Sequence, residues 1–146
     1  MSKNASRNLF SKGFNCAQSI LAAKSNITGL SVSDSLKIAT GFGAGMAMMQ
    51  KTCGAVTGAY MVIGALHGRM KPDDTDARDR TYALIEEFNK QFIGIHGSLS
   101  CLELLGVDLH TEKGRNEAES QGYFDKKCAV YVEDAERILD DILNLR

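Results

Sequence analysis

The chain has 146 residues, of which 44% are hydrophobic, and this is enough for one domain with a proper core. Its 17 Lys and Arg residues are balanced by 18 Asp and Glu residues, so the net charge of −1 gives no electrostatic reason to expect nucleic-acid binding. The N-terminal segment MSKNASRNLF lacks the apolar run of a secretion signal, so we expect a cytoplasmic protein.

The spacing of apolar residues predicts helices throughout. Pro72 is the only proline, and apolar residues recur at intervals of three and four, which favours an all-α, single-domain bundle of about five to six helices over residues 1–146. A first helix is expected from about residue 6 to residue 24, with Cys16 on its apolar face. Ser33 is the expected N-cap of a short second helix that ends near Thr40.

The third predicted helix, residues 46–67, is the segment around which the rest is organised. Lys51 is its only Lys, Arg, Asp or Glu, and buried segments exclude charge because an unpaired charge in an apolar interior is costly. We therefore expect a Gly-rich, buried central helix that carries Cys53. Gly54 and Gly58 lie four residues apart, a spacing that lets another backbone approach, and they are the expected contacts if a cofactor binds.

The same uncharged run, from Thr52 to Gly68, has the minimum length of a membrane span, and glycines interrupt it. Lys51 and Arg69 flank it, as they would flank a buried helix. We expect a core helix and no membrane insertion.

Two further helices are predicted downstream. Thr75 or Asp76 caps the fourth helix, which follows a polar connection. Residues 100–103 fit a capping box, which places Cys101 in the first turn of a short fifth helix that Gly106 ends.

The last third of the chain divides into a polar segment and a final helix. Residues 107–122 are rich in charge, so we expect a mobile excursion with a helical turn around Ala118. The final helix opens at Asp125, with Cys128 three residues later.

The candidate functional residues are the four cysteines, Cys16, Cys53, Cys101 and Cys128. Permanent disulfides are unusual in a reducing cytoplasm, so four thiols suggest redox chemistry, metal binding or core filling. No pair forms CxxC, so the usual zinc-ribbon and ferredoxin patterns are absent. We expect the four cysteines to meet around the central helix.

Helix starts favour thiolate over thiol, because unpaired N–H groups carry partial positive charge. We expect this activation at Cys101 and Cys128, with Lys126 and Lys127 adding to it at Cys128, and at Cys53 if the glycine run breaks the chain before it. A thiolate either attacks a disulfide or ligates a metal, and the sequence alone does not choose between these uses.

The motif around Cys53 resembles a known family. The run Cys53-Gly54-Ala55-Val56-Thr57-Gly58 is a CGAxxG motif, with Cys16 upstream and Cys101 and Cys128 downstream. This ordered set resembles the C_GCAxxG_C_C family of redox-active proteins, and the resemblance covers nearly the whole chain. It implies redox activity at the cysteines, and in related domains of multihaem electron-transfer proteins such cysteines hold an iron–sulfur cluster. This chain has no CxxCH, so covalent c-type haem is not expected.

Three functions follow as hypotheses. The leading one is a thiol–disulfide oxidoreductase in which pairs of these cysteines cycle between dithiol and disulfide. The second is a metal-binding electron-transfer protein that holds an iron–sulfur cluster or zinc with all four cysteines. The third is a helical interaction module in which the Gly54/Gly58 patch serves a homodimer or a partner helix. The cysteine pairing, the redox partner protein and any small-molecule electron donor stay open.

Overall fold

The computed structural model describes residues 4–145, and in that range it consists of helices with no β-strand. The predicted all-α class is confirmed, although the described range holds nine α-helices, because several predicted helices are interrupted or shortened. Residues 1–3 and 146 of the expected domain lie outside the description. The helices are α1 (Ala5–Ser11), α2 (Cys16–Ala23), α3 (Ser25–Thr28), α4 (Val32–Ala39), α5 (Gly54–His67), α6 (Thr75–His96), α7 (Cys101–Leu105), α8 (Glu112–Ser120) and α9 (Ala129–Ile142), with a 3-10 turn at Thr40–Phe42 and a π-helical turn at Phe124–Cys128.

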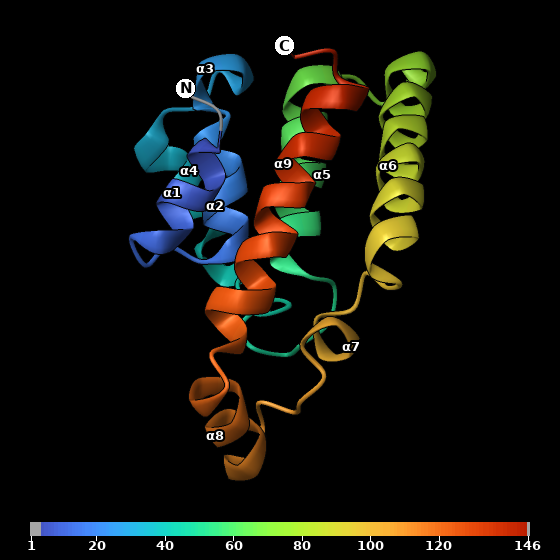
Figure 1. Ribbon diagram of the computed structural model, residues 1–146. Coiled ribbons are helices and arrows are strands. Elements are labelled where there is room, and N and C mark those ends of the chain that lie inside the picture. The colour runs from blue at the N-terminus through green and yellow to red at the C-terminus, as the bar shows by residue number, and fades with distance from the viewer. Residues whose placement is uncertain (1–3, 146) are drawn as a thin grey trace.

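Four long elements enclose the core. In Figure 1, α9 lies between the α1–α2 pair and α6, with α5 behind it, and α7 and α8 lie at the opposite end of the molecule from the C-terminus. The core is built from apolar side chains of α2, α5, α6 and α9 that are almost completely buried. The largest of them are Ile20, Leu21, Val56, Val62, Ile63, Phe88, Phe92, Val132, Ile138 and Leu139.

The predicted first helix is wrong in one respect, because the chain breaks between α1 and α2. Gly13 has φ +108°, a conformation that favours glycine and ends the helical path. A capping box then starts α2: the Asn15 carboxamide accepts from the Gln18 N–H at 2.9 Å, and the Gln18 side chain accepts from the Asn15 N–H at 3.0 Å. Cys16 is therefore the first residue of a helix instead of lying in the middle of one.

The predicted helix 46–67 is also wrong in its first part, because α5 begins only at Gly54. Residues 44–48 all have positive φ, so the chain makes a left-handed turn there. The next residues pair with a distant segment: the Cys53 N–H donates to the Leu99 carbonyl at 2.8 Å, and Thr52 forms an isolated antiparallel bridge with Ser100. This tertiary pairing replaces the helical hydrogen bonds that the apolar periodicity predicted.

Helix starts elsewhere differ from prediction by one or two residues. Ser31, not Ser33, caps α4, with its hydroxyl accepting from the Asp34 N–H at 3.0 Å. Asp74 caps α6 one residue before the predicted Thr75. At α7, by contrast, the expected cap is present: Ser100 is the N-cap.

The helical turn predicted around Ala118 in the segment 107–122 is present as part of a longer helix. The centre of this segment is the regular helix α8, where Thr111 is the N-cap and its hydroxyl accepts from the Gly114 N–H at 2.9 Å. Ala118 is fully buried and packs with Leu105 and Leu109 in a small second core. The high charge of α8 lies on its solvent side, which explains why composition alone suggested disorder.

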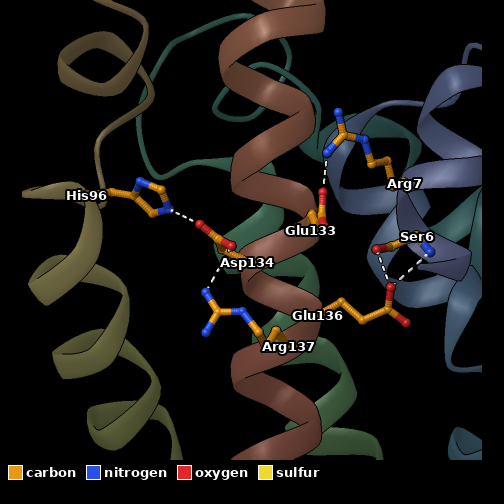
Figure 2. Close-up of polar contacts among 7 residues, drawn as sticks. All are labelled: Ser6, Arg7, His96, Glu133, Asp134, Glu136 and Arg137. Carbon is orange, nitrogen blue, oxygen red and sulfur yellow. Dashed lines mark hydrogen bonds and ion pairs between the residues drawn. The ribbon is translucent and has the colours of Figure 1, made fainter. Parts of the chain in front are cut away.

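Polar contacts fix α1 against α9. Glu136 of α9 is almost fully buried, and its carboxylate accepts from the Ser6 N–H at 3.1 Å and from the Ser6 hydroxyl at 2.5 Å (Figure 2). Lys24 Nζ lies 3.1 Å from the other carboxylate oxygen. On the exposed side, Arg7 pairs with Glu133. These contacts hold α1 where its last residues, among them Phe10, line the site described next.

None of the helices within residues 4–145 is long and apolar enough to cross a bilayer.

Candidate functional site

All four cysteines line a single cavity of about 280 Å³. They come from four different parts of the chain and are free thiols. Cys16 and Cys53 are buried, at 9% and 5% exposure, while Cys101 and Cys128 are half-buried. The four cysteines were expected to lie together beside the helix that contains Gly54. They do line one cavity, and Gly54 lines it too.

Backbone pairing brings Cys53 and Cys101 together. Two backbone hydrogen bonds flank the Thr52–Ser100 bridge. On one side the Cys53 N–H donates to the Leu99 carbonyl, and on the other side the Cys101 N–H donates to the Lys51 carbonyl at 2.6 Å. In an antiparallel bridge, residues that follow the two paired positions point to the same face. The bridge therefore aims both thiols at the cavity, Cys53 as the N-cap of α5 and Cys101 as the first residue of α7.

Cys16 reaches the site because α2 and α5 pack closely. A Cβ at Gly54 would lie 3.0 Å from the Cys16 Cβ, and a Cβ at Gly58 would lie 2.9 Å from the Ile20 Cβ and 3.0 Å from the Ala17 carbonyl. The small residues of the CGAxxG motif are thus required for the approach of α2. Gly58 is not among the residues of the cavity wall, so of the two glycines only Gly54 could touch a bound cofactor.

Because α2 of the same chain covers Gly54 and Gly58, and both glycines are buried, this patch is not open to a homodimer or a partner helix.

Cys128 is the last residue of the π-helical turn that leads into α9. Its backbone is helical, and Asp125 makes no N-cap hydrogen bond there, so the predicted helix start at this cysteine is wrong. Next to it, Lys127 Nζ donates to the Leu105 carbonyl at 2.9 Å and lies 3.9 Å from the Tyr123 ring centroid. These contacts tie the π-helical turn to the end of α7.

Burial has a larger effect than the helix start on the pKa of two of the thiols. It raises the pKa of Cys53 to about 12 and that of Cys101 to about 11. Backbone hydrogen bonds at Cys53, from Ala55 and Val56, oppose the rise in pKa without reversing it. The helix starts were expected to lower the pKa of Cys53 and Cys101, and this prediction is wrong. Removing the thiolate from water destabilises it by more than the helix start stabilises it.

Cys16 and Cys128 shift the pKa of one another in opposite directions. The hydrogen-bonding interaction between their thiols raises the pKa of Cys16, which burial and the other cysteines raise further. The same interaction lowers the pKa of Cys128 against the effect of its own burial, and the Lys127 charge lowers it further. Cys128 is thus the predicted activated thiol, although its activation comes from Cys16 and Lys127 rather than from a helix start.

Two neighbouring residues were not anticipated from the sequence. Tyr131 lines the cavity one helical turn after Cys128 and donates from its hydroxyl to the Leu104 carbonyl at 2.7 Å. Gln50 is 4% exposed and uses both ends of its amide, donating to the Val107 carbonyl at 2.9 Å and accepting from the Leu109 N–H at 2.7 Å. A polar residue at the edge of an apolar run was the only signal for Gln50.

The described side chains around the cavity are not placed as the ligands of a metal ion. Within the described residues, no three His, Cys, Asp or Glu side chains are arranged to hold one metal ion. The four cysteines are free thiols on the wall of one cavity, and a thiol in its thiolate form can attack a disulfide.

Comparison with known proteins supports the family resemblance that the CGAxxG motif indicated. The model of one protein family, described as "Putative redox-active protein (C_GCAxxG_C_C)", matches residues 14–142, a range that includes all four cysteines. No curated protein and no solved structure matches the chain.

Proposed function

The chain belongs to this C_GCAxxG_C_C family, and on that premise we propose that it is a thiol–disulfide redox protein whose reactive dithiol is Cys128 and Cys16. The observation that carries the proposal is the convergence of four free thiols on one cavity, and the lowered pKa of Cys128 supports its choice as the reactive thiol. A reducing cytoplasm, which keeps such thiols free, is the location that fits this use.

Cys128 is the attacking thiol in this proposal. It is half-buried, while Cys16 is buried, so an incoming disulfide meets Cys128 first. The interaction with Cys16 and the charge of Lys127 lower its pKa, and the thiolate is the nucleophile in disulfide exchange.

The exchange has two steps that balance. The Cys128 thiolate attacks a substrate disulfide, which forms a mixed disulfide and releases the first substrate thiolate. Cys16 then attacks the Cys128 sulfur, which breaks the mixed bond, forms the Cys16–Cys128 disulfide and releases the second substrate thiol. The proton of Cys16 leaves with the substrate thiols, and the protein dithiol supplies two electrons.

Cys53 and Cys101 form the second dithiol in this account. Burial keeps both protonated near neutral pH, so they do not compete with Cys128 as first nucleophiles. Their place on the wall of the same cavity allows them to exchange with the Cys16–Cys128 disulfide once it has formed.

Trapping of the mixed disulfide tests the proposal. Cys16→Ser, treated with hydroxyethyl disulfide, is expected to accumulate a stable adduct on Cys128, because the resolving thiol is missing. Cys128→Ser, treated in the same way, is expected to form no adduct on Cys16 at neutral pH. Peptide mass mapping distinguishes these products, and an adduct confined to Cys53 or Cys101 would contradict the assignment.

A second candidate is an electron carrier that holds an iron–sulfur cluster or zinc on the four cysteines. The observation that favours it is that all four thiols line one cavity. It requires the thiols to move closer than the described arrangement, in which no three of the candidate ligands are placed to share a metal ion. Iron, zinc and sulfide analysis of protein purified without oxygen tests it, and about one site per chain is the expected result.

A further inference from the structure

We propose that the cavity admits a small, uncharged aromatic oxidant, a quinone, and that the Cys16–Cys128 dithiol reduces it to the hydroquinone. This inference rests on the proposed function, because it uses the same dithiol, and it names the chemical class of the oxidant. It is carried by the lining of the cavity, the charges around it and the burial of the thiols.

The lining is mostly apolar, and four of its residues are aromatic. Side chains of α1, the α1–α2 loop, the π-helical turn and α9 present four aromatic rings to a cavity of about 280 Å³. Aromatic rings bind flat aromatic ligands by offset stacking and edge contacts, and apolar walls favour ligands without charge. The four rings belong to Phe10, Phe14, Phe124 and Tyr131.

The polar side chains of the wall are mostly used within the protein. Asn15 caps α2 through its carboxamide oxygen and donates to the Thr40 carbonyl at 3.0 Å through its nitrogen. Tyr131 donates to the Leu104 carbonyl. The thiols are therefore the main polar groups left to contact a ligand in the cavity. A thiol is only a weak hydrogen-bond donor and acceptor, so the wall selects for a ligand with few polar groups.

Charge argues against anionic oxidants such as glutathione disulfide. Among residues 4–145, Asp125 is the only charged residue that lines the wall. Of the nearby cations, Lys127 donates to the Leu105 carbonyl and Arg115 donates to the Leu109 carbonyl at 3.0 Å, and neither lines the cavity. A ligand carboxylate would meet a negative charge and lose water without gaining a cation.

Burial argues against large oxidants. At 9% exposure, Cys16 has little surface that a folded partner can touch, so a protein disulfide has to project into the cavity before Cys16 can resolve it. A quinone the size of a single substituted ring carries its reactive atoms into the cavity itself.

The reaction balances without another reactant. The dithiol loses two electrons and two protons as its two sulfurs form the Cys16–Cys128 bond. The quinone gains the same two electrons and two protons, its two C=O groups become C–OH groups, and the ring becomes aromatic. Nothing else is oxidised or reduced.

The test uses duroquinone, whose ring positions are all methylated, which disfavours a permanent thiol adduct. Reduced wild-type protein, kept free of oxygen, is mixed with duroquinone or, separately, with glutathione disulfide. The expected result is one hydroquinone for each Cys16–Cys128 disulfide found by peptide mapping, and slower oxidation by glutathione disulfide at equal concentration.

Three variants locate the reaction in the cavity. Phe124 lines the cavity but is 39% exposed, so Phe124→Glu places a carboxylate at its wall without opening the core. We expect it to slow the duroquinone reaction by about tenfold, because a buried ligand edge would face an unpaired charge. Phe124→Leu keeps the wall apolar and is expected to lose much less. Met70→Glu, at a residue 97% exposed and outside the cavity wall, controls for the added charge.

The outcomes separate this inference from the proposed function. If glutathione disulfide oxidises the Cys16–Cys128 pair and duroquinone does not, the quinone inference is overturned while the thiol function stands. If Phe124→Glu and Met70→Glu behave alike, the cavity is not the quinone site. If neither oxidant forms the disulfide, both proposals fall.

Discussion

Cys16 and Cys128 line the same cavity, although one begins α2 and the other ends the π-helical turn before α9, and each thiol shifts the pKa of the other. The interaction is asymmetric, because it stabilises the thiolate of Cys128 and the protonated form of Cys16. This asymmetry is the arrangement that a nucleophile and a resolving thiol need. It also gives the first prediction.

Alkylation of Cys128 should show a lowered midpoint pH. The rate of iodoacetamide labelling at Cys128, followed by peptide mass spectrometry, is expected to reach half of its maximum below the ordinary thiol pKa. Cys16→Ala removes the interaction that lowers the pKa of Cys128, so the midpoint should rise toward the ordinary thiol pKa. An unchanged midpoint in Cys16→Ala would mean that Cys16 does not activate Cys128.

Burial of Cys53 predicts a loss of stability at alkaline pH. Its pKa is about 12 in the folded protein against 9.0 for an ordinary thiol, so the folded state keeps a proton that the unfolded chain releases. The contribution of this thiol to stability is complete below pH 9 and is lost between pH 9 and pH 12, at about 1.4 kcal/mol for each pH unit.

Urea unfolding with a reductant, at pH 8 and pH 10, measures this loss. Cys53→Ala has no ionisable group at the position, so its free energy of unfolding should fall by about 1 kcal/mol less than that of the wild type over the same interval. Equal losses in the two proteins would show that Cys53 ionises as readily in the folded state as in the unfolded chain.

Two glycines of α5 should respond in opposite ways to alanine. Gly58→Ala places its Cβ against Ile20 and the Ala17 carbonyl, and we expect it to lower the free energy of unfolding by about 1–3 kcal/mol. Gly64 has no atom within 4 Å of its ideal Cβ, so Gly64→Ala should raise stability by about 0.5–1 kcal/mol through helix propensity. Denaturant unfolding of both variants checks the pair; destabilisation by Gly64→Ala equal to that by Gly58→Ala would argue against close packing of α2.

The buried carboxylate of Glu136 should matter more than its exposed neighbour Glu133. Glu136→Gln leaves Lys24 facing an amide and weakens the bonds from Ser6, so we expect a loss of about 1–3 kcal/mol. Glu133→Gln breaks only the exposed pair with Arg7 and should cost less than about 1 kcal/mol.

Loosening of α1 in Glu136→Gln should also be visible at the site. Phe10 of α1 lines the cavity, so a less firmly held α1 exposes Cys16. Faster alkylation of Cys16 in Glu136→Gln than in Glu133→Gln is the expected result. Equal rates would show that the contacts between α1 and α9 do not control access to Cys16.

The sequence predicted the helical class, the cysteine set and several helix ends, because these depend on local signals. The cap at Ser100 and the stop at Gly106, which has φ +82°, are examples. The glycine spacing at Gly54 and Gly58 correctly indicated a close backbone approach, and the structure identifies α2 as the partner.

What the sequence missed depends on contacts between distant segments. The bridge between Thr52 and Ser100 delays the start of the predicted central helix to Gly54, and neither segment carries a strand-like pattern. The pKa directions of Cys53 and Cys101 reverse because burial outweighs the helix start, and burial at each thiol is set by elements far away in the chain. No local signal in the sequence places Cys16 and Cys128 on the wall of the same cavity.

Disulfide mapping of the wild-type protein identifies which two thiols form the reactive dithiol. Reduced protein is treated with one equivalent of hydroxyethyl disulfide under native conditions, quenched in acid and digested for peptide mass spectrometry. We expect the first disulfide within the chain to join Cys16 to Cys128, while Cys53 and Cys101 are still reduced. A first disulfide between Cys53 and Cys101, or four thiols that never change oxidation state, would contradict this expectation.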